Sequence, residues 1–130
     1  MKSFIFALLI TATQTFAATS ASKMNFVKPQ DKEVVPTTFP VEFAVTGMTI
    51  EKAGVMKKGT GHHHLIIDGS PIPAGKSVPK NETHIHYGDG SFQTNLNLKP
   101  GTHTLTLQFA DGSHISYGPE YSKTITITVK

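Results

Sequence analysis

The sequence predicts an all-β protein, an immunoglobulin-like antiparallel β-sandwich of about seven strands preceded by a signal peptide. Three observations predict it. Apolar and polar residues alternate along several short segments, turn residues separate those segments, and no segment has the period of a long helix. Residues 22–130 have an ordinary length for one domain with one hydrophobic core, and we expect them to form a single β-sandwich domain.

The N-terminal residues have the layout of a secretory signal peptide. A lysine precedes the apolar run 4–10, and small residues follow it. We expect residues 1–18 to be the signal peptide, with cleavage near Ala17 or Ala18. Because the apolar run is too short to cross a bilayer and no later segment is continuously apolar, we expect a periplasmic or secreted protein with no membrane span.

The alternating segments define the predicted strands. Along residues 39–46, apolar side chains occupy every second position, which is the period of a half-buried strand. The last segment carries β-branched residues on both faces, as strands prefer, and Lys99-Pro100-Gly101 predicts a hairpin between two earlier strands. The predicted strands are residues 24–27, 39–46, 62–68, 84–87, 92–98, 103–109 and 121–129.

The composition excludes some kinds of chemistry and partner. The chain has no cysteine, so disulfides and thiolate ligands cannot form. Its basic residues are all lysines, scattered singly or in the pair Lys57-Lys58. Proteins that read nucleic acids rely on the bidentate fork of arginine and on clustered charge, so we expect no nucleic-acid partner.

The histidines are the most informative residues. Five of the seven fall in two short groups, at residues 62–64 and at residues 84–86. Alternate side chains of a strand share a face, so His62 and His64 can approach one ion, as can His84 and His86. Pairing of the two strands would bring four imidazoles together. Imidazole suits copper and zinc, so we predict a transition-metal site that takes copper, with zinc as the alternative, and that releases its ion in acid.

Three other histidines have competing interpretations. His103 and His114 lie near strand ends, where loops could fold them over the same rim. His103 equally fits a histidine at the core edge that bonds a backbone carbonyl, and His114 a solvated loop residue. His63 faces away from its neighbours, which suits a second ion, a partner of the ligands, or simple packing. The candidate ligands are therefore His62, His64, His84, His86, His114, His103 and His63.

Methionines and aspartates add weaker signals. The thioethers of Met48 and Met56 are soft donors suited to Cu(I), although methionine more often fills core space. Asp68, Asp89 and Asp111 lie near histidines and could orient imidazole rings, although their surroundings are also typical of turns.

Four ordered motifs resemble a bacterial family of exported domains, the domain-of-unknown-function 4399 family. They are GHHHLIID at residues 61–68, HIHYGDG at 84–90, PGTHTL at 100–105 and DGSHI at 111–115. The likeness covers roughly residues 48–129, and it implies an exported, single-domain β-protein without supplying a catalytic residue. The chain departs from the family at Ser116-Tyr117, where members often carry a further histidine.

We therefore expect a periplasmic protein that buffers or carries copper, that exchanges it with a metal-delivery partner, and that is not an enzyme. One alternative is a metal-dependent redox enzyme similar to copper-zinc superoxide dismutase, which also has a His-x-His strand like residues 84–86. That family is typically held by a disulfide, and this chain also lacks a dedicated general base and a Gly-x-Ser-x-Gly motif. The other alternative is an adhesion or structural module whose histidines are structural.

Overall fold

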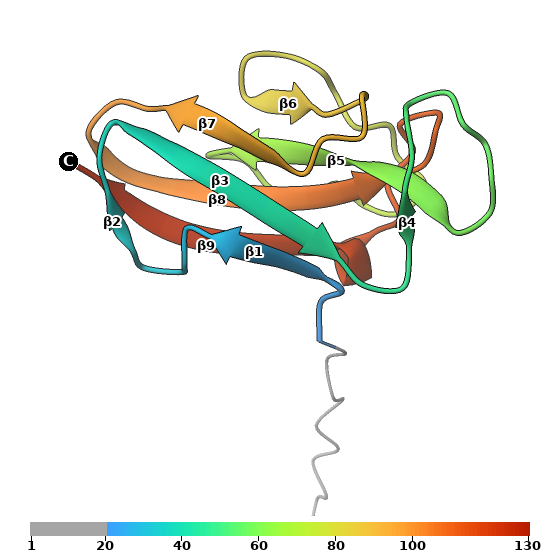
Figure 1. The fold of residues 1–130 in the computed structure, drawn as a ribbon, viewed down its shortest axis with the longest axis horizontal. Coiled ribbons are helices and arrows are strands. Elements are labelled where there is room, and N and C mark those ends of the chain that lie inside the picture. The colour runs from blue at the N-terminus through green and yellow to red at the C-terminus, as the bar shows by residue number, and fades with distance from the viewer. Residues whose placement is uncertain (1–20) are drawn as a thin grey trace, which may run out of the picture.

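The computed structural model describes residues 21–130, so the predicted signal peptide lies outside the described residues. Figure 1 shows two sheets that pack against each other face to face. The prediction of an all-β sandwich with antiparallel sheets is confirmed. Within residues 21–130, no helix is long and apolar enough to cross a membrane.

The smaller sheet has the order β1-β3-β7, and the larger has the order β2-β9-β8-β5-β4, with β6 also paired to β5. The strands of the smaller sheet are β1 (Met24–Lys28), β3 (Thr38–Val45) and β7 (Gln93–Asn97). Those of the larger sheet are β2 (Val34–Val35), β4 (Thr49–Ile50), β5 (Thr60–Ile67), β6 (His84–His86), β8 (Gly101–Ala110) and β9 (Ser122–Val129). A short 3-10 helix, Pro119–Tyr121, precedes β9.

Each predicted strand has a counterpart in the structure, and its ends differ by no more than two residues. The strands β2 and β4 were not predicted, because two residues are too few to show a period. Both pair in parallel, β2 with β9 and β4 with β5, whereas the other strand pairs described for residues 21–130 are antiparallel.

The hydrophobic core lies between the two sheets. Phe39, Val41 and Phe43 of β3 are buried there, and the residues between them face outward. The larger sheet contributes alternate residues of β8 and β9, including Leu105 and Ile127. This alternation is the one that the sequence predicts, because burying one face of a strand requires apolar residues at a period of two.

Strand β5 is an exception, because both of its faces are buried along its whole length. Leu65 and Ile67 face the core between the sheets. On the opposite face, Ile66 is fully buried and lies against Gly69. The chain that follows β5 also contacts the turn after β8, because the backbone amide of Val78 donates a hydrogen bond to His114 O at 2.8 Å. Loops therefore cover the outer face of β5.

Gln108 of β8 holds this cover in place. It lies directly opposite His64 of β5 and is fully buried. Its Oε1 accepts a hydrogen bond from the amide of Ile72 at 3.0 Å, and its Nε2 lies within donating distance of the carbonyl oxygens of Gly118 and Tyr121, both at 3.2 Å. One buried side chain thus ties two separate loops to the sheet.

Replacing Gln108 by leucine, Gln108→Leu, should lower the free energy of unfolding by about 2 to 4 kcal/mol, because the volume is kept while buried backbone groups lose their partner. Urea denaturation followed by circular dichroism measures the change. The control is Gln93→Leu at an exposed position of β7, which should change stability by less than about 0.5 kcal/mol. Equal effects of the two substitutions would contradict this role for Gln108.

Candidate metal centre

The alternation of β5 separates its three consecutive histidines. His62 and His64 point to the outer face, and His63 points into the core. All three side chains are fully buried. Strand β6 pairs antiparallel with β5 and sets His86 directly opposite His64. Directly opposite residues of an antiparallel pair share a face, so β6 places a third imidazole beside the other two.

His114 lies in the turn that follows β8. The Oδ1 atom of Asp111 accepts backbone N–H bonds from Ser113 at 2.8 Å and from Ile115 at 3.0 Å, and His114 N donates to Asp111 O at 2.9 Å. His114 adopts a φ of 66°, in the left-handed region that costs a side-chain-bearing residue about 1 kcal/mol or more. Such strain is typical of residues that a functional site holds in place.

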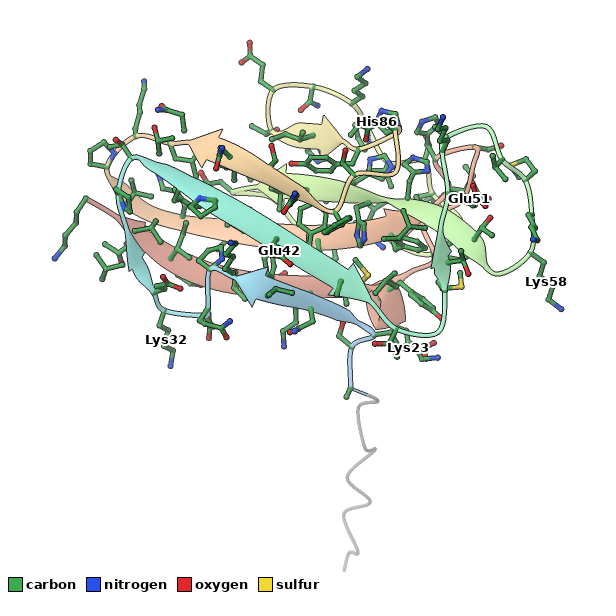
Figure 2. All side chains as sticks on the ribbon, in the orientation of Figure 1. Lys23, Lys32, Glu42, Glu51, Lys58 and His86 are labelled. Atoms are coloured by element: carbon green, nitrogen blue, oxygen red, sulfur yellow. The ribbon has the colours of Figure 1, made fainter. Side chains whose placement is uncertain are left out.

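Close contacts between Nε2 atoms link the four imidazoles in a row. These atoms are separated by 3.1 Å between His64 and His62, by 3.1 Å between His62 and His86, and by 3.0 Å between His86 and His114. His62, His86 and His114 each offer one ring nitrogen within 4.8 Å of the others, so they form a triad that could hold a metal ion. We call the triad together with His64 the histidine cluster. Figure 2 shows the labelled His86 where several nitrogen-bearing rings gather.

Hydrogen bonding alone does not account for these contacts. Each Nε2 atom carries either one proton or one lone pair, so four such atoms can form at most two hydrogen bonds among themselves. The histidine cluster has three close Nε2 contacts, so at least one of them is not a hydrogen bond. A cation held by the triad would instead use the lone pairs that face it.

Burial keeps the inner rings uncharged. Burial, followed by the charge of neighbouring histidines, lowers the pKa of His62 to about 4 and that of His64 to about 3. Burial and then the charge of His114 also lower the pKa of His86. Near neutral pH these imidazoles are therefore neutral, which is the state in which a ring nitrogen can bind a metal ion.

Neither inner ring has a hydrogen-bond partner on its other nitrogen. Within residues 21–130, the Nδ1 atoms of His62 and His64 are buried and unpaired. The nearby aspartates serve turns instead: Asp89 Oδ1 accepts the amide of Ser91 at 2.9 Å, as Asp111 does for its own turn. The structure therefore places these carboxylates in turns and not on the imidazoles.

Three predicted ligands lie outside the histidine cluster. His84 shares the face of His86, but its Nδ1 lies 3.1 Å from both Asn81 Oδ1 and Thr83 Oγ1, at the surface. His63 packs between Phe43 and Phe109, with ring centroids at 4.6 and 5.1 Å, and its buried ring nitrogens have no partner among the described residues. Burial lowers the pKa of His63 to about 4. The third is His103.

His103 ties the start of β8 to the end of β5 and to the β7–β8 connection. The predicted hairpin at this connection is wrong, because β7 and β8 lie in different sheets. The Nδ1 of His103 lies 2.8 Å from Asp68 Oδ2, its Nε2 lies 2.8 Å from Lys99 O, and Asp68 Oδ1 accepts the amide of Thr104 at 3.0 Å. The hydrogen bond to Asp68, followed by that to Lys99, raises the pKa of His103. Its contribution to stability is complete below pH 6.5 and is lost as the pH rises through the raised pKa. The structure thus favours the backbone-bonded interpretation of this residue.

The methionines occupy two different settings. Met48 is partly buried and packs against the core. Met56 is 65% exposed, and its Sδ atom accepts a hydrogen bond from the hydroxyl of Ser113 at 3.2 Å. Ser113 immediately precedes His114, so an exposed thioether contacts the turn that carries one ring of the histidine cluster.

The loop after β4, residues 51–58, forms hydrogen bonds with the two segments that carry the partly exposed rings, His86 and His114. Ala53 N donates to Gly88 O at 2.9 Å, and Gly54 N donates to Gly112 O at 2.8 Å. Gly88 follows His86 by two residues and Gly112 precedes His114 by two. Adjacent amides of one loop therefore connect the segments that carry His86 and His114.

Gly88 also makes room for a ring of the cluster. A Cβ atom built at this residue would lie 2.6 Å from His86 Nε2 and closer still to Cε1. The φ angle of Gly88 lies outside the left-handed region, so the backbone itself would tolerate another residue. The absence of a side chain at Gly88 is what lets the imidazole of His86 turn into the cluster. Sequence reasoning missed this residue, and the Gly-x-Gly turn after His-x-His was the available signal.

The family model for a domain of unknown function, DUF4399, matches residues 41–130. The chain belongs to this family. The matched region of the DUF4399 protein contains all four histidines of the cluster, the Gly88 turn and Gln108. Neither a curated protein nor a solved structure matches the chain.

The metal-free DUF4399 protein should lose stability as the pH falls from 6.5 toward 4. The unfolded chain takes up protons near the ordinary histidine pKa of 6.5, whereas His62, His63 and His64 do so near pH 3 to 4 when folded. Acid therefore favours unfolding, by about 1.4 kcal/mol per pH unit for each of these histidines. Urea denaturation between pH 7 and pH 5 measures this slope.

Two variants sharpen this pH test. His63→Leu removes one buried ionisable ring, so it should reduce the slope and leave the protein more stable than wild type at pH 5. Val41→Ala is the control, because it removes apolar packing in the core and should lower stability equally at pH 7 and pH 5. A wild-type protein with no slope in this range would show that the rings are not buried as neutral groups.

Proposed function

We propose that this DUF4399 protein binds one transition-metal ion, copper or alternatively zinc, in the histidine cluster, and that it buffers or carries the ion in an exported compartment. The observation that carries the proposal is the convergence of Nε2 atoms from β5, β6 and the turn after β8 at separations of 3.0 to 3.1 Å. Export is supported by the layout of residues 1–18.

The dimensions of the cluster fit an ion after a small adjustment. A tetrahedral metal with bonds of about 2.0 to 2.1 Å to imidazole separates its ligand nitrogens by about 3.4 Å. The close contacts in the cluster are a few tenths of an ångström shorter, so binding requires the rings to move apart slightly. Movement of His86 and His114 is easier than movement of His62 and His64, because the first two are partly exposed and the last two are fully buried.

The position of His64 favours carriage over catalysis. A catalytic metal site keeps one coordination position open for water or substrate. Here His64 approaches the triad from its buried side, with Nε2 3.1 Å from that of His62. A fourth imidazole beside the triad can fill that position, which suits a site that holds an ion and releases it.

His86→Ala should raise the dissociation constant for copper or zinc at least about 100-fold, or about 2.7 kcal/mol, because it removes the ring that joins His62 to His114. Protein purified without a histidine tag should bind one ion with a dissociation constant below about 1 µM. Isothermal titration calorimetry with a competing chelator measures both values.

The matched control is His84→Ala, two residues away on the same strand and on the same face. Its ring bonds Asn81 and Thr83 and does not join the cluster, so affinity should be unchanged. Equal losses in the two variants would show that binding depends on the surface of β6. Unchanged affinity in His86→Ala would show that the ion binds elsewhere.

Gly88→Ala tests the site without removing a ligand. The added methyl group occupies the space of the His86 ring, so metal affinity should fall at least about tenfold, while the unfolding midpoint of the metal-free protein changes little. Ser91→Ala in the same turn serves as the control, since it keeps the backbone amide that bonds Asp89. If Gly88→Ala kept its full metal affinity, binding would not depend on the orientation of the His86 ring.

A further inference from the structure

We propose that the ion selected by the histidine cluster is monovalent copper, Cu(I), in preference to Cu(II) and Zn(II). This inference rests on the proposed metal binding and concerns only the ion that the site prefers. Two features of the described residues carry it: the absence of negative charge on the ligands, and a soft donor beside the exposed rings.

The ligand set carries no negative charge. All four members of the cluster are imidazoles, and His62 and His64 are fully buried. An ion bound by neutral ligands keeps its entire charge within the protein. The free energy of desolvation grows with the square of the charge, so burying a divalent ion costs about four times as much as burying a monovalent ion. A divalent ion in a buried site is normally compensated by thiolate or carboxylate ligands.

The nearby carboxylates add no negative charge to the ligand set. Asp111 acts on His62, while Asp89 and Lys80 act on His86 with opposite signs. Both carboxylates accept backbone amides in their own turns, so neither is placed as a ligand.

A soft donor lies on the exposed side of the cluster. Met56 is 65% exposed and its sulfur contacts Ser113, next to His114. Thioether sulfur is a soft ligand that suits Cu(I). The partly exposed rings of His86 and His114 and this thioether thus lie on adjoining parts of the surface, where Cu(I) can pass from sulfur to nitrogen ligands.

The test compares three dissociation constants of the wild-type protein. Cu(I) is titrated without oxygen against a chromogenic Cu(I) chelator, and Cu(II) and Zn(II) are titrated in air against chelators of known affinity. We expect Cu(I) to bind at least about 100-fold more tightly than either divalent ion. For copper, this ratio equals a shift of about 120 mV in the reduction potential relative to the free ion, at 59 mV per tenfold.

Two variants at one position isolate the contribution of charge. His114→Glu supplies an anionic ligand and should shift the ratio of Cu(I) to Zn(II) affinity at least about tenfold toward Zn(II). His114→Gln supplies a neutral oxygen on a side chain of the same length and should not produce that shift. Equal ratios in the two variants would overturn the charge argument.

The outcomes separate this inference from the proposed function. Tighter binding of Cu(II) or Zn(II) than of Cu(I) by the wild-type protein would overturn the preference and leave metal binding intact. Failure to bind any of the three ions would overturn the proposed function itself. Tight Cu(I) binding that His86→Ala abolishes and His84→Ala preserves supports both.

Discussion

The register of β5 between β6 and β8 is the constraint on which the core and the histidine cluster both depend. Because side chains alternate along a strand, one register sends His63 and Leu65 into the core and sends His62 and His64 to the outer face. A slip of one residue would exchange these two sets. It would place two imidazoles among the aromatic rings of the core and only one beside His86. Core packing and cluster assembly therefore select the same pairing.

The outer face of β5 shows how the sandwich accommodates buried polar rings. Buried polar groups in folded proteins normally have hydrogen-bond partners, yet the Nδ1 atoms of His62 and His64 have none within residues 21–130. The loops tied down by Gln108 cover this face and keep solvent from the inner rings. A protein that keeps such an arrangement gives up some stability, and departures of this kind are concentrated at functional sites.

Much of the fold could be predicted from the sequence, because alternation of apolar residues is a local signal. The same period predicted that His62 and His64 share a face. It could not distinguish His84 from His86, which have the same parity on one strand. What separates them is contacts that the pattern does not contain: Asn81 and Thr83 hold the first ring, and space above Gly88 admits the second.

The settings of the other histidines depend on residues distant in the sequence. His103 is held by Asp68, 35 residues earlier, and this pairing requires the start of β8 to lie beside the end of β5. His114 reaches the cluster through a turn closed by Asp111, where the sequence indicated only a strand end followed by a loop. The strands β2 and β4 were missed for a similar reason, since their pairing comes from neighbouring strands and not from their own residues.

The loop at residues 51–58 contributes no imidazole, yet its adjacent amides bond the segments that carry His86 and His114. The spacing of the two outer rings is therefore encoded in a stretch of chain separate from the rings themselves. Changes of length or stiffness in this loop can alter that spacing while every histidine stays the same. Proteins that share this histidine pattern can accordingly differ in how firmly the outer pair closes, without any difference in the motifs by which they are recognised.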